Sequence, residues 1–266
     1  MPEGDTVYLT ARRLHEVLAG QCLLVGELRH PSYAEHNLAG RTVTSVRSVG
    51  KHIFTRFNDG LSLHSHLRMD GSWHVSPSDH RQRQWHRPAH QARAVLTTAQ
   101  HTVVGFALHD LELLATAHEA RLVGHLGPDL LDPAWSEQHA TQAADRLAAC
   151  GAAEIGIALL DQRVMAGIGN LYKNELCFLL GVSPFAATDT LPAIRVVALA
   201  RRLLLANATR PHRSTTGKLA SGQQYWVYER GGKPCRRCGE RILRQPQGEG
   251  IYARGTYTCH RCQNGN

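Results

Sequence analysis

A pair of Cys-x2-Cys motifs restricts the fold of this chain more than any other feature of its sequence. Cys235 and Cys238 form the first motif, and 20 residues separate it from Cys259 and Cys262. Two such turns can bring four thiolates around one tetrahedral Zn²⁺ ion and leave a β-hairpin between them. Four sulfur ligands leave no position for a catalytic water, so we expect this zinc to be structural. A redox function is the alternative, and two pairs at this spacing disfavour it.

The basic residues of the chain are concentrated in the same region. Residues 201–266 contain 13 Lys and Arg but only 3 Asp and Glu, whereas the rest of the chain contains 17 and 19. Five arginines lie in the first cysteine motif or between the two motifs: Arg236, Arg237, Arg241, Arg244 and Arg254. A charged segment often serves only as a solvated surface. Its coincidence with a small metal-bound hairpin favours binding to the phosphates of an anionic polymer.

The sequence also indicates where the protein works. No apolar run approaches the roughly 20 residues of a membrane span. The first 20 residues are acidic and polar at the front and do not have the apolar core of a signal peptide. We therefore expect a cytoplasmic protein that does not contact membranes. Disulfides are rare in that compartment, so Cys22, Cys150 and Cys177 are expected to be small core residues.

The hydrophobic pattern predicts a β-rich first half. Residues 5–19 show the apolar spacing of a helix, which ends before Gly20. Short β-like runs follow from about residue 22 to residue 115, separated by turns such as Asn58-Asp59-Gly60. This pattern is typical of an antiparallel sandwich. The polar residues 77–91 are expected to form a loop.

A stretch rich in Gly and Pro separates this half from a helical one. Helical patterns lie near residues 136–149, 153–160, 170–180 and 190–208, and short strands return at about residue 225. The predicted fold is α+β with two domains, a β-sandwich carrying a terminal helix and a helical module carrying the zinc hairpin. The predicted boundaries are 1–123 for the sandwich, 124–133 for a linker, 134–224 for the helical module and 225–266 for the zinc hairpin.

The first residues could carry chemistry. A small residue after Met1 permits removal of the methionine, which exposes the secondary amine of Pro2. An α-amine has an ordinary pKa near ~8, so a useful fraction is unprotonated at neutral pH. Condensed with a sugar aldehyde carbon, this amine gives a charged iminium that promotes elimination, and Glu3 could donate a proton. Taken alone, an N-terminal Pro-Glu pair is far more often without catalytic function.

Four motifs in a fixed order change that interpretation. They are MPEGDTV at the start, VGKHIF around Lys51, GIGNLYKNE at residues 167–175 and RGTYTCHRCQ near the end. Together they resemble the formamidopyrimidine-DNA glycosylase/endonuclease VIII family, and the HLGPDLL stretch at residues 125–131 agrees. The resemblance spans the chain. It implies that the helical module is a helix–two-turns–helix element.

The resemblance also implies roles for individual residues. Pro2 would attack C1′ of the damaged nucleotide, and Glu3 would be the general acid at the sugar ring oxygen. Lys51, in the turn Gly50-Lys51-His52, would contact a phosphate beside the lesion and assist elimination. Arg254 would grip the phosphates from the zinc hairpin. Without the family, an exposed turn lysine would be the simpler interpretation of Lys51.

Other residues are expected to bind DNA in the same scheme. Asn170 is predicted both to cap the helix that follows Gly169 and to contact a phosphate, which free N–H groups at a helix start can also hold. Lys173 in the same motif is predicted to contact DNA. Arg68 and Met69 occupy the position of the wedge that fills the vacancy left by an extruded nucleotide. Met69 could equally be a core methionine at a strand end.

The resemblance is closer to the endonuclease VIII branch of the family. Only ten residues separate Thr216 from Val227, where purine-specific members have a longer loop. Oxidised pyrimidines and abasic sites in double-stranded DNA are the predicted substrates, with single-stranded or bubble DNA as further candidates for a monomeric enzyme. An oxidised-purine glycosylase and a non-catalytic zinc protein that binds damaged DNA are the alternatives. His64 and His66 alternate on a strand, but in a chain with 17 histidines coincidence explains them better than a metal site.

Overall fold

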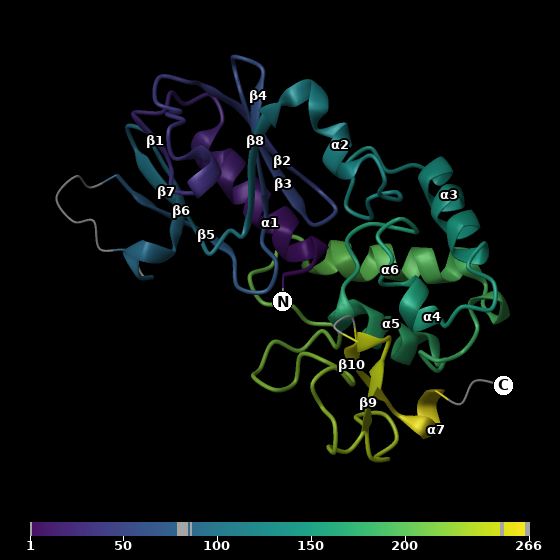
Figure 1. Ribbon diagram of the computed structural model, residues 1–266. Helices are drawn as coiled ribbons and strands as arrows, with labels where there is room; N and C mark the ends of the chain where they lie inside the picture. Colours follow the sequence, from purple (N-terminus) through teal and green to yellow (C-terminus); the bar gives the residue numbers. More distant parts are fainter. Residues whose placement is uncertain (1, 79–84, 86, 251–252, 264–266) are drawn as a thin grey trace. The chain divides into compact units, whose positions relative to one another are not determined.

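The chain forms two compact units. The computed structural model describes residues 2–78, 85, 87–250 and 253–263. One unit consists of Pro2 with Thr6–His125, and the other of Glu3–Asp5 with the chain from Leu126 onward (Figure 1). The segment Glu3–Asp5 therefore makes its contacts with residues that follow it by more than 100 positions.

Two four-stranded antiparallel sheets make up the first unit and confirm the predicted sandwich. The first sheet has the order β1-β6-β7-β5, with strands Val25–Leu28, Ala92–Thr97, His101–Phe106 and Ser72–Pro77. The second has the order β2-β3-β4-β8, with strands Val43–Val49, His52–Phe57, Leu61–His66 and Asp110–Ala115. The predicted turn at Asn58-Asp59-Gly60 joins β3 to β4, and Gly60 has a φ of +80°.

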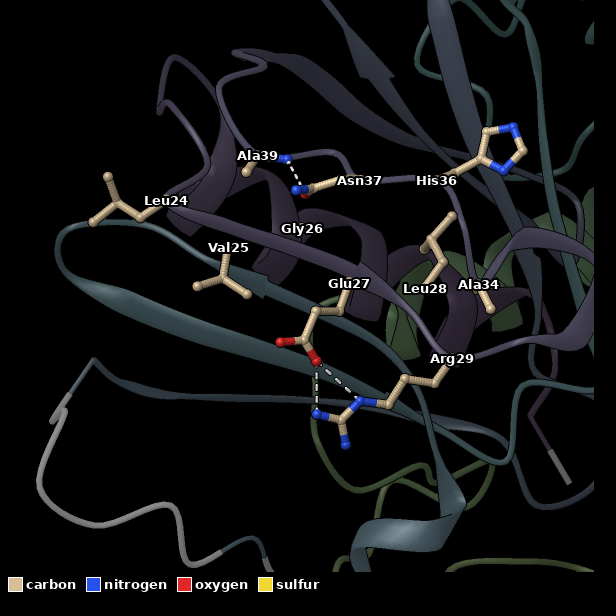
Figure 2. A pocket seen from close by; sticks show the side chains of 10 residues that line it. All are labelled: Leu24, Val25, Gly26, Glu27, Leu28, Arg29, Ala34, His36, Asn37 and Ala39. Atoms are coloured by element: carbon tan, nitrogen blue, oxygen red, sulfur yellow. Dashed lines mark hydrogen bonds and ion pairs between the residues drawn. The ribbon is translucent and has the colours of Figure 1, made fainter.

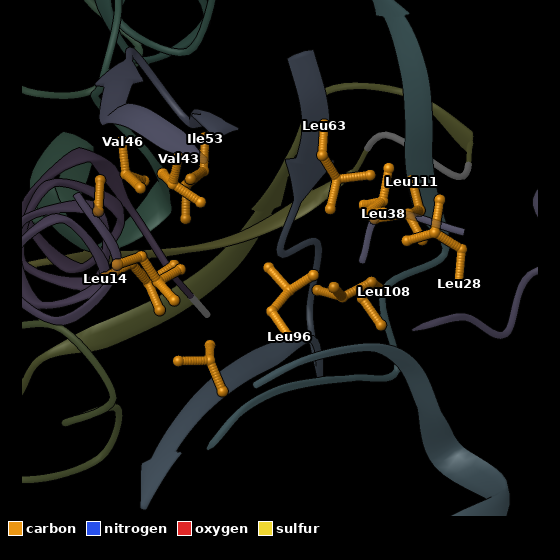
Figure 3. Packing of buried hydrophobic residues seen from close by; sticks show 14 of the residues in the cluster. Leu14, Leu28, Leu38, Val43, Val46, Ile53, Leu63, Leu96, Leu108 and Leu111 are labelled. Atoms are coloured by element: carbon orange, nitrogen blue, oxygen red, sulfur yellow. The ribbon is translucent and has the colours of Figure 1, made fainter. Parts of the chain in front are cut away.

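Helix α1, Gly4–Leu18, contributes the apolar stripe on which this unit packs. Val7, Ala11, Leu14 and Leu18 recur every three or four residues and are at most 2% exposed. They join one hydrophobic cluster with inward-facing residues of both sheets (Figure 3). The sheet residues in this cluster include Val43, Val46, Ile53, Leu63, Leu96 and Leu111.

Two strands and one short helix of the first unit were not predicted. Strand β5 has the sequence SWHVSP, in which three half-buried residues are followed by three exposed ones, so it does not show the alternation that identifies a half-buried strand. Strand β8 and helix α2, Ala120–Val123, lie where the sequence suggested no separate element. Part of the loop expected at residues 77–91, namely residues 79–84 and 86, lies outside the described residues.

The second unit is helical and ends in a small hairpin. Its helices are α3 Glu137–Ala148, α4 Ile155–Ala158, α5 Asn170–Leu180, α6 Ala193–Asn207 and α7 His260–Gln263. Strands β9, Leu243–Gln247, and β10, Arg254–Thr258, pair antiparallel. As predicted, α5 stops at Gly181, which has a φ of +77°. Short 3-10 turns lie at Pro31–Tyr33, Ala89–Gln91, Thr116–His118 and Thr188–Thr190.

The two units divide after His125, within the stretch 124–133 that was predicted as a linker. Beyond that point it is packed rather than extended. Leu130 and Leu131 are buried, and Asp129 forms a parallel bridge with Ala166 within the second unit. The bounds of the four predicted segments stay predictions.

Two of the three remaining cysteines differ from expectation. Cys177 is buried as predicted, but Cys22 is exposed and Cys150 is only half-buried. Their apolar sequence neighbours suggested core positions, but such a stretch also contains exposed residues: next to Cys22, Leu23 is buried whereas Leu24 is exposed. None of the helices in the described residues combines the length and the apolar character that a membrane crossing requires.

A hollow of about 540 Å³ lies along β1 (Figure 2). Residues of β1 and of the segment 34–39 line it, and an ion pair between Glu27 and Arg29 borders it, with 2.7 Å between the charged atoms. None of the site residues predicted from the sequence lines this hollow.

A buried carboxylate ties the second sheet to the turn that follows it. Glu119 is 3% exposed and accepts hydrogen bonds from Arg56 at 2.6 Å, Ser62 at 2.6 Å and Arg47 at 2.8 Å. Burial alone would oppose its ionisation. The hydrogen bonds from the two arginines and Ser62 outweigh that effect and lower the pKa of Glu119 to about 2.

This carboxylate should make the chain acid-sensitive. Its ordinary pKa is 4.5 and its folded pKa is about 2. The stabilisation is therefore complete above pH 4.5 and is lost as the pH falls from 4.5 towards 2, by about 3 kcal/mol. Urea unfolding across that window should show a steeper loss of stability for the wild type than for Glu119→Gln. The exposed-residue control Glu35→Gln should follow the wild type, and parallel wild-type and Glu119→Gln curves would contradict the assignment.

Candidate active site

The carboxylate of Glu3 caps the N-terminus of helix α5. Glu3 is 1% exposed, and its two oxygens accept hydrogen bonds from the N–H groups of Gly169 at 2.7 Å, Leu171 at 2.7 Å and Tyr172 at 3.3 Å. The first turn of a helix has unpaired N–H groups and a partial positive charge, so a carboxylate is stabilised there. The residue next to Pro2 is thus fixed by the backbone of a helix far along the chain.

Two glycines make this close approach possible. A Cβ atom on Gly169 would lie 2.4 Å from Cδ of Glu3, so any larger residue would displace the carboxylate. Gly167 has a φ of +111°, and its carbonyl accepts a hydrogen bond from the N–H of Gly4 at 2.9 Å. The Gly-x-Gly pattern therefore leaves room for the N-terminal segment of the chain.

The prediction that Asn170 caps α5 is wrong. The capping position is Gly169, and Asn170 is the first helical residue. The helix N–H groups that were expected to be available for a phosphate include those that bind Glu3. The physical reason is that the partner for these groups comes from a residue 166 positions away in the chain, which local sequence cannot reveal.

A second buried carboxylate lies beside Glu3. Asp5 is 1% exposed and accepts a hydrogen bond from the hydroxyl of Tyr172 at 2.9 Å. Arg213 approaches the same carboxylate at 3.7 Å. Burial, and then the negative charge of Asp5, raises the pKa of Tyr172 far above its ordinary value, so the phenol stays a neutral donor. Sequence reasoning missed Asp5 and Arg213, although Asp5 stands within the MPEGDTV motif.

Three of the other predicted site residues of the first unit lie at turns, and Pro2 lies just before helix α1. Pro2 is half-buried and directly precedes Glu3. Lys51 is half-buried in the two-residue turn between β2 and β3, in which Gly50 has a φ of +57°. Met69 is 69% exposed in the turn after β4, so it is not the core methionine that the sequence left open. Arg68 is exposed beside it and forms an ion pair with Asp110.

In the second unit, one face of α5 holds strand β10. The side-chain amide of Asn170 donates to the carbonyl of Gly255 at 3.0 Å, and Asn174 accepts from the N–H of Tyr257 at 2.6 Å. These bonds position the strand that Arg254 begins. Arg254 itself is exposed. The predicted phosphate contacts of Lys51, Asn170 and Arg254 stay predictions.

Lys173 lies between those two asparagines and is fully buried. Its ammonium donates to Oγ1 of Thr256 at 2.5 Å and to Oε1 of Gln247 at 3.2 Å. Burial lowers the pKa of Lys173 to about 8. This location gives no support to the prediction that Lys173 contacts DNA. Its contacts instead join α5 to both strands of the hairpin.

Glu175, the last residue of the GIGNLYKNE motif, holds the backbone of the segment that leads to the first cysteine motif. Its carboxylate is fully buried and accepts hydrogen bonds from the N–H groups of Trp226 at 2.8 Å, Val227 at 2.9 Å and Tyr228 at 2.9 Å. Burial raises the pKa of Glu175, and the hydrogen bonds oppose that rise. Nothing local in the sequence identified this role, because its partners lie about 50 residues further along the chain.

The four cysteines of the two motifs come together as predicted. The sulfur atoms of the four cysteines all lie within 4.8 Å of one another. The sulfur–sulfur distance is 3.9 Å between Cys235 and Cys262 and 3.4 Å between Cys238 and Cys259. Sulfurs bound to one tetrahedral zinc at about 2.3 Å would be about 3.8 Å apart, so the spacing fits such an ion. Phe178, Val227 and Ile242 pack against the cluster. The four residues could hold a metal ion.

Comparison with protein families decides where the chain belongs. Residues 1–126 match the formamidopyrimidine-DNA glycosylase N-terminal domain, and residues 126–217 match the formamidopyrimidine-DNA glycosylase H2TH domain. The chain belongs to the formamidopyrimidine-DNA glycosylase/endonuclease 8 family.

Relatives of both branches of this family align along the whole chain. A probable endonuclease 8 2 of Streptomyces coelicolor is 52% identical over 100% of this chain and 95% of its own length. The DNA-(apurinic or apyrimidinic site) lyase Nei2 of Mycolicibacterium smegmatis is 45% identical over 99% of each chain. A formamidopyrimidine-DNA glycosylase of Acidiphilium cryptum is 31% identical over 99% of this chain and 98% of its own length. The higher identities support the endonuclease 8 branch.

Solved structures of this family share the fold. The formamidopyrimidine-DNA glycosylase of Lactococcus lactis, in a complex with DNA containing an abasic site, has a TM-score of 0.78 at 23% identity. The match covers 98% of this chain and 99% of that one. The sandwich, the helical module and the cysteine hairpin therefore belong to a known architecture, and the predicted α+β fold is confirmed.

The contact between Gly169 and Glu3 can be tested by adding one methyl group. Gly169→Ala should push the carboxylate away from the α5 N-terminus and destabilise the protein by roughly 1–3 kcal/mol, measured by urea unfolding. If the methyl group acts through Glu3, the same substitution in a Glu3→Ala background should cost much less, because the space is then empty. Equal costs in both backgrounds would show that the glycine is required for another reason.

Proposed function

We propose that this protein is a bifunctional DNA glycosylase and abasic-site lyase of base excision repair. The observation that carries the proposal is the fixed position of Glu3, buried against the α5 N-terminus one residue after Pro2. An ordinary N-terminal segment has no reason to be held so firmly. Family membership and the names of the relatives from Streptomyces and Mycolicibacterium support the same activity.

The reaction begins with the amine of Pro2, freed by removal of Met1. Its nitrogen forms a bond to C1′ of the damaged nucleotide, and the bond from C1′ to the base breaks. The base leaves with the electron pair of its bond to C1′. The Pro2 amine gives up its proton to the Glu3 carboxylate, and Glu3 then donates that proton to the ring oxygen as the sugar ring opens. The product is an iminium with a permanent positive charge on the proline nitrogen.

The iminium then drives cleavage of the strand. It withdraws electrons from C1′, so a proton leaves C2′ and the 3′ phosphate departs by β-elimination. A second, δ-elimination releases the 5′ phosphate. Hydrolysis of the iminium with water finally returns Pro2 as a free amine. Lys51 and Arg254 bind the phosphates around the lesion. The hydrogen bond from Asn170 to Gly255 keeps in place the strand β10, which begins with Arg254.

The proposed substrate is double-stranded DNA that carries an oxidised pyrimidine or an abasic site. The endonuclease 8 names of the more similar relatives support this choice. So does the short segment between Thr216 and Val227. Binding to phosphates should be salt-sensitive and largely independent of base sequence. We expect a monomer that acts in the cytoplasm and that also accepts single-stranded or bubble DNA.

The metal that we propose for the cysteine cluster is one structural Zn²⁺, held by Cys235, Cys238, Cys259 and Cys262. The sulfur spacing and the four-thiolate donor set support zinc. When bound, the ion stabilises the hairpin fold and supplies no chemistry to the reacting sugar. The bond-breaking steps then rest on Pro2 and Glu3.

Borohydride trapping tests the catalytic proposal. The Met1-processed protein should form a covalent adduct with a duplex containing thymine glycol and with an abasic duplex, and Pro2→Gly should trap sharply less. Trapping on the abasic duplex alone would keep the lyase and remove the pyrimidine assignment. Release of 8-oxoguanine paired with cytosine in preference to thymine glycol would favour the oxidised-purine alternative. No adduct on either duplex, with a free Pro2 and bound zinc, would leave a non-catalytic DNA-binding protein.

Metal analysis tests the zinc proposal. We expect about one zinc per chain in the wild type. Cys259→Ser should lose the metal, lower the melting temperature and weaken DNA binding, because the hairpin depends on the ion for its fold. Cys22→Ser, at an exposed cysteine outside the cluster, should keep the metal and serve as the control. Full zinc content in Cys259→Ser would contradict the assigned ligands.

A further inference from the structure

Helix α6 leaves one of its faces open. It packs against α3 and α5 within the second unit, through its buried residues (Figure 1). Its exposed residues are Ile194, Arg195, Ala198, Arg202, Leu205 and Ala206. Four of them, at positions 194, 198, 202 and 205, recur every three or four residues and so form one stripe along the helix. Ile194 and Leu205 are 53% and 46% exposed. Large apolar side chains that share an exposed face favour an interaction surface over chance exposure.

Two hollows flank this stripe. Residues of α6, Ala140 of α3 and Trp135 just before α3 line the larger hollow, which has a volume of about 640 Å³. Residues of α6 and the end of α5, at Leu179, line the smaller one, of about 410 Å³. Ala198 and Arg202 line both hollows. The small side chain of Ala198 lets a partner chain approach the helix between two apolar cavities.

The wall of the larger hollow is held in place. The guanidinium carbon of Arg201 lies 4.8 Å from the centre of the Trp135 ring, and Arg201 also donates to the carbonyl of Leu130. The Trp135 ring stacks on His139 with 5.8 Å between the ring centres. A cavity that is already ordered costs less conformational freedom to fill. Tryptophan and arginine are also the residue types that contribute most often to binding energy at protein interfaces.

The charge of this face has one sign. Arg195 lines the smaller hollow and Arg202 lines both, and both side chains are exposed. In the part of the chain that the structure describes, neither guanidinium forms an ion pair. The described residues that line the two hollows include no Asp or Glu. The face therefore offers apolar cavities together with positive charges that have no acidic neighbour among them.

This combination separates the possible occupants. A second copy that bound through the same face would bring arginines opposite arginines, because a twofold interface pairs a surface with itself. DNA phosphates would match the charge but would leave the apolar cavities empty. An anionic bilayer would match both properties but has no protruding groups that fit two separate hollows. A peptide with carboxylates and large apolar side chains matches the charge and fills the cavities.

We propose that this face of α6 is a docking site for a segment of another protein in which carboxylates alternate with large apolar side chains. The segment crosses α6 at Ala198, places an apolar side chain in each hollow and pairs its carboxylates with Arg195 and Arg202. None of the site residues predicted from the sequence lines either hollow. A docked partner therefore does not occupy the groups of the proposed reaction, and the inference goes beyond the proposed function without depending on it.

Fluorescence anisotropy with labelled peptides tests the proposal on the full chain. The probe is a set of acidic twelve-residue peptides (length of about 12) whose two apolar side chains, Leu and Phe, lie from about two to about seven residues apart, which covers extended and helical segments. One comparison set has Lys in place of each acid, and another has Ser in place of Leu and Phe. We expect the best acidic peptide to bind with a Kd of roughly 10–100 μM. The comparison peptides should bind at least about tenfold more weakly. No binding of any acidic peptide below about 1 mM would overturn the proposal.

Reversing one charge locates the site. Arg202→Glu should weaken the acidic peptide by about tenfold or more and should bind the lysine peptide better than the wild type does. Ala198→Gln leaves the charge unchanged and covers the ridge between the hollows, so it should weaken binding by about fivefold or more. Arg13→Glu, at an exposed arginine on helix α1, is the matched control and should bind like the wild type. Wild-type affinity in both Arg202→Glu and Ala198→Gln would overturn the proposal.

Thermal unfolding verifies that each variant is folded, and Arg195→Glu supplies a second charge reversal if Arg202→Glu is not. The other occupants give different results. Loss of duplex binding in Arg202→Glu would identify a DNA contact, and binding of phosphatidylglycerol vesicles without peptide binding would identify a membrane surface. A dimer in sedimentation that Ala198→Gln abolishes would identify an interface between copies. Each of these three results would overturn the proposal. The peptide measurements do not require an active enzyme, so they are independent of any failure of the proposed function.

Discussion

The carboxylate of Glu3 at the N-terminus of α5 is the interaction on which the candidate site depends. Adjacent Cα atoms are about 3.8 Å apart, so fixing Glu3 leaves Pro2 little freedom beyond its own torsion angles. The polar end of a helix often binds a phosphate from a ligand. Here the chain uses its own carboxylate for that position. A residue assigned to proton donation is therefore also a helix cap, and a substitution at Glu3 changes the fold and the chemistry together.

Helix α5 connects this cap to the hairpin. Its first turn binds Glu3, its Asn170, Lys173 and Asn174 side chains hold the β9–β10 hairpin, and Glu175 holds the backbone that leads to the cysteines. Each of these polar side chains has a partner distant in the sequence. The GIGNLYKNE motif is thus explained by packing within one unit as much as by contact with DNA. The glycines admit Glu3, and the polar residues orient the strand on which Arg254 stands.

Local patterns predicted the parts of this molecule that depend on local forces. The amphipathic stripe of α1, the Asn58–Gly60 turn, the Gly181 helix stop and the cysteine spacing all had signals within a few residues. Two failures at the candidate site share one cause, because each depended on a partner far along the chain. Asn170 looks like a helix cap until Glu3 fills that role, and Lys173 looks like a DNA contact until Thr256 and Gln247 enclose it. Strand β5 was missed for a different reason: none of its residues is buried, so it has no alternation of buried and exposed residues to detect.

The buried polar groups fix the positions of neighbouring elements, whether or not they add to the stability of the fold. Burying Lys173 against neutral partners costs free energy that an apolar residue would not, and burying Glu175 does the same. Hydrogen bonds are directional, however, whereas apolar contacts allow neighbouring elements to slide. His66 follows the same logic, because its ring accepts a hydrogen bond from the N–H of Arg68 at 3.1 Å. Hydrogen bonds thus set the positions that must be accurate for the proposed chemistry. The apolar core of the sandwich supplies stability that offsets the free energy of burying these polar groups.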